Sequence, residues 1–291
     1  MMNGYDLRQT GDFKRLQDDL LLKSRLESFF EQKGVKPLFA AINGAHLWGL
    51  QSSESDIDIH GIYLKPTLQI LDMHPGDDTI QAKIDIGNGY PEIELQFHEL
   101  QKFMHMLMHN NGNVITMVNS PFVVYTDHPD LIPGFWPSIA SAFLTKQLRH
   151  YFKGYAYAQK KRALSTRGGK ALIYTYREMF SGMYLMKFGK LEFSFQNLLE
   201  VAKDQGWYPP APYSLGLLYK YYKPGTGNLT GLVDTNDWND FFLEWDLLAN
   251  QLEILAETSM LPDSVDGYNL CNSILKAYRI ESMRSEPGFY K

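Results

Sequence analysis

The sequence has little cysteine and no long hydrophobic run, and these two shortages exclude several classes of protein. A single cysteine, Cys271, cannot form a disulfide within the chain. Apolar runs such as Leu38–Ile42 are far shorter than the roughly 18 residues needed to cross a bilayer. The polar segment Met1–Thr10 also lacks the apolar stretch of a secretory signal. We therefore expect an intracellular, cytoplasmic protein with no membrane role.

The sequence also lacks a large net charge, but its basic residues are unevenly distributed. A formal charge of −5 over 291 residues gives no overall attraction to nucleic acid or to an acidic membrane. Between Lys146 and Lys190, however, eleven lysines and arginines accompany a single acidic residue, Glu178. This segment carries a charge of about +10, and the rest of the chain about −15. A partner that carries phosphates would therefore be attracted to this segment.

The first half of the sequence combines helical and strand patterns. Apolar residues recur at helical spacing from Leu16 to Phe30, and Gly34 and Pro37 supply a stop. Strand patterns follow at 38–42, 57–63, 79–86 and 91–97, with a tight hairpin turn at Gly87–Tyr90, and a second helix is expected at 98–109. These elements predict a small mixed sheet with a helix before it and another after it.

The second half of the sequence shows no alternating segment after Pro133. Apolar residues recur there every three or four positions, and the clearest helix follows Asp237 with a stripe from Phe241 to Leu255. Pro209–Pro212 and Lys223–Gly227 are typical of loops between helices. The second half is therefore predicted to be helical.

A chain of this length commonly forms two domains. We predict an α+β fold in which a small mixed β-sheet domain with flanking helices, residues 1–132, precedes an all-helical domain, residues 133–291.

Two aspartates, Asp56 and Asp58, are the strongest candidates for catalysis. In a strand alternate side chains share a face, so these carboxylates converge while Ile57 and Ile59 enter the core. Two like charges this close favour a bound cation, and hard oxygen ligands suit Mg²⁺ or Mn²⁺. A solvated strand end is the alternative interpretation, because Asp-x-Asp alone is a common pattern.

A glycine turn precedes the aspartates and favours the metal site. Gly44 and Gly49 follow a predicted strand, and glycines there let backbone N–H groups approach a phosphate without a β-carbon in the way. The pattern Gly44-x4-Gly49-x5-Ser55-Asp56-x-Asp58 resembles the polymerase-β-type nucleotidyltransferase superfamily. Within it, residues 44–50 and 55–61 look like the branch of RNA-ligase-associated nucleotidyltransferases, and blocks at 98–103, 111–115 and 170–177 extend the resemblance.

The resemblance implies which residues bind the nucleotide. They are Gly44, Ala45, His46, Gly49 and Ser55, with Lys170 and Arg177 contacting the triphosphate. Ala45 stands where the superfamily usually has a serine whose hydroxyl contacts the phosphates, and His46 is the residue that would compensate. Lys170 and Arg177 are two helical turns apart, so they can share a helix face. A solvated basic face is the alternative.

The resemblance also implies a third carboxylate from a neighbouring strand. Glu92 and Glu94 share one face of the predicted strand 91–97. We choose Glu94, because its distance to His98 fits the family block, and hold Glu92 in reserve. The implied metal ligands are Asp56, Asp58 and Glu94, with Glu94 holding the activating metal or accepting the proton of the nucleophile. Ordinary glutamates on an exposed strand face are the alternative.

The function implied by the resemblance is transfer of a nucleoside monophosphate from an NTP to a hydroxyl, with Mg²⁺ or Mn²⁺ and release of pyrophosphate. RNA or tRNA is the expected acceptor, from the association of the family and the basic segment. Two alternatives stay open. One is nucleotidylation, such as AMPylation, of a protein or small molecule. The other is a catalytically silent nucleotide- or RNA-binding module, because Ala45 replaces the usual serine.

Overall fold

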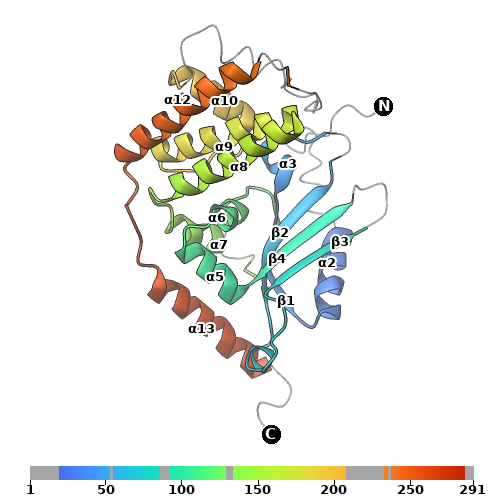
Figure 1. The fold of residues 1–291 in the computed structure, drawn as a ribbon. Helices are drawn as coiled ribbons and strands as arrows, with labels where there is room; N and C mark the ends of the chain where they lie inside the picture. Colours follow the sequence, from blue (N-terminus) through green and yellow to red (C-terminus); the bar gives the residue numbers. More distant parts are fainter. Residues whose placement is uncertain are drawn as a thin grey trace. The chain divides into compact units, whose positions relative to one another are not determined.

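The computed structural model describes residues 20–52, 55–85, 92–128, 134–207, 233–234 and 237–285 (Figure 1). These residues form one five-stranded sheet and a set of helices, so the predicted α+β class is confirmed. None of the helices in these ranges has the length and apolarity needed to cross a bilayer.

The chain divides into two compact units that are interleaved in the sequence. The described residues of the first, which we call the sheet unit, lie within Leu7–Gly44, Asp56–Phe143 and Val265–Lys291. Those of the second, the helical unit, lie within Ala45–Ser55 and Leu144–Ser264. The two predicted domains are contiguous, whereas each of these units is assembled from separate stretches of the chain.

The sheet is mixed, as the sequence predicts. Its strands are β1 (Lys36–Ile42), β2 (Ile57–Leu64), β3 (Thr79–Ile84), β4 (Ile93–Glu99) and β5 (Val123–Thr126), in the order β3-β4-β2-β1-β5. β2 and β4 are parallel, and the other neighbouring strands are antiparallel. The antiparallel pairing of β3 with β4 confirms the predicted hairpin, whose turn at Gly87–Tyr90 lies outside the described residues. β5 was not predicted.

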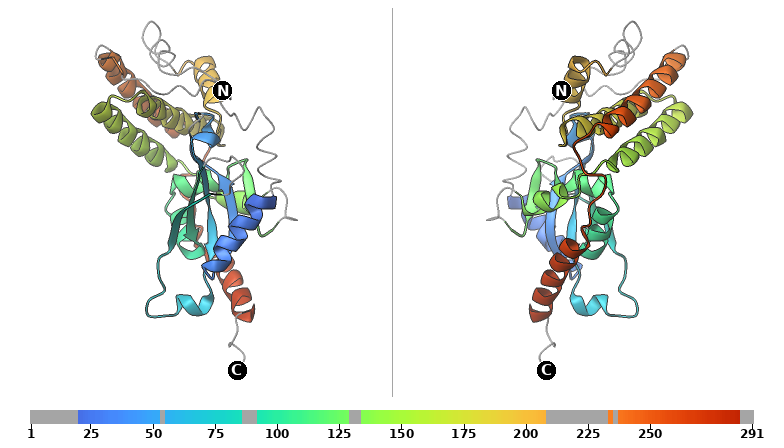
Figure 2. Two further views of the ribbon diagram at one scale, coloured as in Figure 1. Left: turned by 90° about the vertical axis from the view of Figure 1, so that its right-hand side faces the viewer. Right: turned by 90° about the vertical axis from the view of Figure 1, so that its left-hand side faces the viewer.

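Helices of the sheet unit lie on both sides of the sheet. They are α2 (Leu20–Gln32), α4 (Thr67–Ile70), α5 (Leu100–Met108), α6 (Gly112–Val118), α7 (Phe135–Ser141) and α13 (Tyr268–Ser285). Figures 1 and 2 show α2 on one side and α5, α6 and α13 on the other. The rings of Phe30 in α2 and Phe97 in β4 are 4.7 Å apart. Because side chains alternate along a strand, α2 covers the face opposite to that of Glu94.

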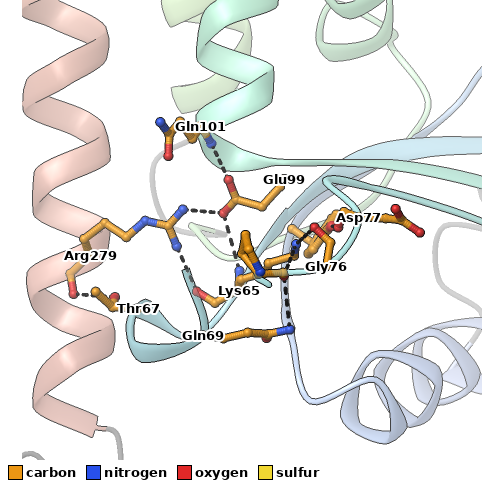
Figure 3. Close-up of polar contacts among 10 residues, drawn as sticks. Lys65, Thr67, Gln69, Gly76, Asp77, Glu99, Gln101 and Arg279 are labelled. Carbon is orange, nitrogen blue, oxygen red and sulfur yellow. Dashed lines mark hydrogen bonds and ion pairs between the residues drawn. The ribbon is translucent and has the colours of Figure 1, made fainter. Parts of the chain in front are cut away.

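Helix α13 is anchored to the sheet unit by a network of buried polar groups (Figure 3). The guanidinium of Arg279 pairs with the carboxylate of Glu99 and donates to the backbone oxygen of Lys65 at 2.8 Å. The second oxygen of Glu99 accepts from the backbone N–H of Gln101 at 2.7 Å, which caps α5. Thr67 donates to the backbone oxygen of Arg279 at 3.1 Å. The network therefore ties α13 to the strand end and to α4.

The helical unit is built around one long buried helix. This unit contains most of α3 (Gly44–Trp48) together with α8 (Leu148–Thr166), α9 (Gly169–Phe188), α10 (Phe195–Asp204) and α12 (Asp237–Glu257). The long buried helix is α9. A β-carbon at Gly182 in α9 would collide with Phe152 of α8 and crowd Leu252 of α12, so this glycine allows close packing of three helices. The stripe predicted on α12, from Phe241 to Leu255, is buried.

Candidate functional site

The structure brings the three predicted carboxylates together on one face of the sheet unit. The parallel pairing of β2 with β4 places Asp58 opposite Glu94, in register. Asp56 directly precedes β2, and its side chain is within hydrogen-bonding reach of Glu94. On the other side of β4, Lys83 of β3 is opposite Glu94. Asp58, Glu94 and Lys83 therefore form a row across three strands, which we call the carboxylate row.

Lys83 supplies the positive charge of this row. Its Nζ lies 2.6 Å from a carboxylate oxygen of Glu92 and 2.6 Å from one of Glu94. Hydrogen bonds to these two glutamates raise the pKa of Lys83, and the hydrogen bond from Lys83 lowers the pKa of Glu94. Glu94 is therefore held ionised. Lys83 could not be predicted from the sequence, because alternation puts it on a strand face without showing which strand is its neighbour.

The turn after β1 is packed directly against the carboxylate of Asp58. Gly44 has a φ of +61°, and a β-carbon at this position would overlap the Asp58 carboxylate. The backbone N–H of Asn43 donates to the backbone oxygen of Asp58 at 2.8 Å. The side chain of Asn43 is buried, and its Nδ2 has no hydrogen-bond partner among the residues that the structure describes. The site therefore contains an amide donor that still needs an acceptor.

Within the described ranges, no group of three or more His, Cys, Asp or Glu side chains is already arranged to hold a metal ion. In the carboxylate row a cation, the Lys83 ammonium, already contacts Glu94. The donor set of Asp56, Asp58 and Glu94 consists of carboxylate oxygens, which are the ligands that Mg²⁺ and Mn²⁺ prefer. The residues present therefore fit a hard divalent cation in chemistry, and their role as metal ligands stays a prediction.

A pocket of about 400 Å³ opens on this face of the sheet. It is lined by Asp58, His60, Gln81, Ala82, Lys83, Glu94, Leu95 and Gln96. Burial, with a smaller contribution from the nearby His98, lowers the pKa of His60 to about 4. His60 is therefore neutral at physiological pH. No role for His60, Gln81 or Gln96 was predicted from the sequence, because the pocket depends on the order of strands that are distant in sequence.

The predicted glycine turn is a short helix rather than an open loop. Ala45 and His46 are buried within α3, and Gly49 follows it with a φ of +68°. The hydroxyl oxygen of Ser55 accepts from the backbone N–H of Ser52 at 2.9 Å. Ser55 therefore closes a local turn just before the aspartates.

Lys170 and Arg177 lie on one face of α9, as their spacing predicts. Lys170 Nζ is 5.9 Å and Arg177 Cζ is 5.3 Å from the ring centroid of Tyr174. Lys170 is exposed, whereas Arg177 is only 4% exposed, lies 3.9 Å from the ring centroid of Trp48 and pairs with Glu178. Arg177 Nε has no hydrogen-bond acceptor in the part of the chain that is described. Lys170 is thus accessible to a ligand, and Arg177 holds α3 against α9.

A match to a family model identifies the class of protein, the polymerase-β-type nucleotidyltransferases. The model of the RNA repair pathway DNA polymerase beta family matches residues 21–211, more than half of the chain. The protein belongs to this family, which confirms the resemblance seen in the sequence.

Comparison with solved structures gives a more distant likeness. A nucleotidyltransferase-like protein from Exiguobacterium sibiricum 255-15 is 12% identical, with 91% of this chain and 79% of that chain covered and a TM-score of 0.31. A TM-score this low says nothing about the site. A comparison with curated proteins finds no match.

Proposed function

We propose that this protein transfers a nucleoside monophosphate from an NTP to a hydroxyl group and releases pyrophosphate. The observation that carries the proposal is the in-register pairing of β2 with β4, which puts Asp58 beside Glu94 with Asp56 in reach. Membership of the nucleotidyltransferase family supports the same reaction class.

Asp56, Asp58 and Glu94 are the proposed ligands of Mg²⁺ or Mn²⁺. When bound, the cation would neutralise phosphate charge and acidify the attacking hydroxyl. The lowered pKa of Glu94 favours the ligand role over the role of general base, because an ionised carboxylate with a low pKa is a weak proton acceptor. Gly44 contributes by leaving room for the Asp58 carboxylate.

The bond changes of the proposed reaction are those of substitution at phosphorus. The acceptor hydroxyl oxygen forms a bond to the α-phosphorus, and the bond from this phosphorus to the bridging oxygen breaks. Pyrophosphate leaves with the electron pair, and the hydroxyl proton passes to water in the open pocket. An inline attack of this kind requires mainly orientation and neutralised charge from the protein, and Asp56, Asp58 and Glu94 would supply both when they hold a divalent cation.

Phosphate contacts are proposed for the glycine segment and for α9. Gly44, Ala45, His46, Gly49 and Ser55 form the nucleotide-binding segment, in which Ala45 can contribute only its backbone. The exposed ammonium of Lys170 contacts the triphosphate. Arg177 is proposed to act by fixing Trp48, and with it the position of α3, because its own guanidinium is buried.

The proposed acceptor is RNA, with tRNA as one form of it. The family is named for an RNA repair pathway, which supports this class of acceptor. The basic segment from Lys146 to Lys190 supports it independently, because lysine and arginine neutralise phosphates along a nucleic-acid backbone.

Labelling with radioactive nucleotides tests the proposal. Each α-³²P-labelled NTP is incubated with the protein, Mg²⁺ or Mn²⁺, and total RNA, purified tRNA or a protein mixture. We expect label in RNA, lost in Asp56→Asn and Asp58→Asn and retained in the matched control Asp72→Asn, which changes an exposed aspartate of the sheet unit. Label in protein alone would contradict the RNA acceptor, and RNA binding without any transfer would favour a silent binding module.

A further inference from the structure

A second row of side chains lies beside the carboxylate row on the same sheet face. His60 of β2 is in register with Gln96 of β4, and Gln96 is in register with Gln81 of β3. Each of these residues is two positions along its strand from Asp58, Glu94 or Lys83. Side chains two positions apart share a face, roughly 7 Å from one another. The two rows therefore run parallel across the same three strands.

The second row differs from the first in its chemistry. Two carboxamides and an imidazole replace the carboxylates and the ammonium, and each of these groups combines hydrogen-bond donors with an acceptor. Carboxamide side chains pair with base edges through one donor and one acceptor, as in the contact of Asn or Gln with adenine. Directed hydrogen bonds, rather than charge neutralisation, are what this row offers a ligand.

Both rows line the same pocket of about 400 Å³, which is large enough for a small organic ligand. Apart from Ala82 and Leu95, the described residues that line it are polar, and none of them is Phe, Tyr or Trp. An apolar peptide side chain would therefore find little to pack against. A nucleoside suits the pocket better, because its sugar hydroxyls and its base edge are separated by a distance similar to that between the rows.

We propose that Gln96 and Gln81, assisted by His60, form the acceptor subsite and bind the terminal nucleoside of the RNA by hydrogen bonds to its base and ribose. The 3′-hydroxyl of that nucleoside then lies at the carboxylate row, beside Glu94. This inference rests on the proposed function and adds the residues that recognise the acceptor. A protein hydroxyl would occupy the carboxylate row alone and leave the second row without partners.

Binding without chemistry tests the subsite directly. The probe is a fluorescent single-stranded RNA of about ten nucleotides that ends in a 3′-deoxynucleoside, which keeps the 2′-hydroxyl of the ribose, and it is prepared with each of the four bases. Anisotropy in Mg²⁺ gives the Kd for wild type, Gln96→Ala, Gln81→Ala and the double variant. We expect the Kd for the preferred terminal base to rise about 5- to 100-fold in Gln96→Ala, as for loss of a bidentate base contact. The differences in Kd among the four terminal bases should become smaller.

Two further variants separate recognition from folding. Gln101→Ala removes an exposed glutamine of α5 that lies outside the pocket, and its Kd should equal that of wild type. Gln96→Glu keeps the size of the side chain but removes its donors, so it should also weaken binding while the thermal unfolding midpoint stays that of wild type. In turnover with extendable RNA, the glutamine variants should raise KM for RNA and leave KM for NTP unchanged.

The outcomes distinguish this inference from the proposed function. If wild type transfers nucleotide to RNA and the double glutamine variant has the wild-type Kd and the wild-type KM for RNA, the subsite is wrong and the reaction stands. If wild type transfers nothing to RNA and does not bind the probe, the RNA acceptor itself is wrong.

Discussion

Two glutamates on β4, Glu94 and Glu99, each pair with a basic side chain, but in opposite surroundings. The Glu94 side chain is 39% exposed, and its partner Lys83 is 58% exposed and shared with Glu92. The Glu99 side chain is 3% exposed, and its partner Arg279 is 12% exposed. The two sites lie five residues apart on one strand, and this odd separation directs the two side chains to opposite faces of the sheet.

The difference between the pairs lies in how completely their polar groups are satisfied. Glu99 also caps α5, and Arg279 also donates to the backbone of Lys65 (Figure 3). A buried pair of this kind is costly to break, because either charge left alone is not solvated. An exposed pair contributes little to stability, because water screens both charges, so Lys83 is readily exchanged for another cation. The buried pair of Glu99 and Arg279 is therefore structural, and the exposed pair of Glu94 and Lys83 is suited to bind a ligand.

Glu94→Gln should give the largest effect and should affect activity alone. Loss of one charge from the carboxylate row should lower kcat for nucleotide transfer on the order of 10³-fold, as for removal of one preorganised electrostatic group. The free energy of unfolding should change by less than about 1 kcal/mol, because the side chain is exposed. Single-turnover transfer and urea unfolding measure the two quantities. A kcat near that of wild type would show that Glu94 is not part of the catalytic site.

Glu99→Gln should have the reverse effect, with a loss of stability. The substitution leaves the Arg279 guanidinium without its counter-charge in a buried position and should lower the free energy of unfolding by about 3 kcal/mol or more. Urea unfolding is the measurement. The matched control is Glu281→Gln, an exposed position on α13, which should stay within about 0.5 kcal/mol of wild type. Equal stability of the two variants would contradict the assignment of a structural pair.

Gly44→Ala should combine backbone strain with damage to the carboxylate row. An alanine at a φ of +61° costs about 1–2 kcal/mol, and its methyl group would displace the Asp58 carboxylate. Gly34→Ala is the matched control, because Gly34 has a φ of +65° and nothing within 4 Å of an added β-carbon. Both variants should lose similar stability, and only Gly44→Ala should weaken Mn²⁺ binding in titrations followed by electron paramagnetic resonance.

Lys83→Met should give the smallest effect, a gain in metal affinity. Removing the ammonium that contacts Glu94 should lower the Kd for Mn²⁺ by up to about five-fold at low salt, the limit set by an exposed ion pair. Lys102→Met is the control, because Lys102 forms an equivalent 2.6 Å pair with Asp78 outside the pocket. Weaker binding in Lys83→Met would show that Lys83 supports the metal site instead of competing with the metal.

Local patterns in the sequence predict four of the five strands and several of the described helices. A short apolar run identifies β1, strand patterns identify β2 to β4, and apolar spacing identifies α2 and α12, since these patterns are properties of a single segment. The boundary at His98 and Glu99 was misplaced, because these residues continue β4 and Glu99 then caps α5. β5 was missed because Val123–Thr126 is too short to show alternation.

Contacts between distant segments could not be predicted from the sequence. The pairing that places Asp58 beside Glu94 joins strands separated by β3, and no local pattern states the strand order. The preference for Glu94 over Glu92 came from the family resemblance. In the structure Glu94 lies within β4 and is paired with Asp58, whereas Glu92 precedes the strand. Lys83 and Arg279 were missed for the same reason, because a charged residue does not reveal its partner.

The interleaving of the two units has a mechanical consequence. Residues 45–55 belong to the helical unit, but the chain enters them from Gly44 and leaves them into Asp56, which both belong to the sheet unit. This segment is therefore tethered at both ends to residues that adjoin the carboxylate row. Because Gly44 and Asp56 are the residues at which the chain enters and leaves this segment, a change in the position of α3 acts on both of them through the backbone.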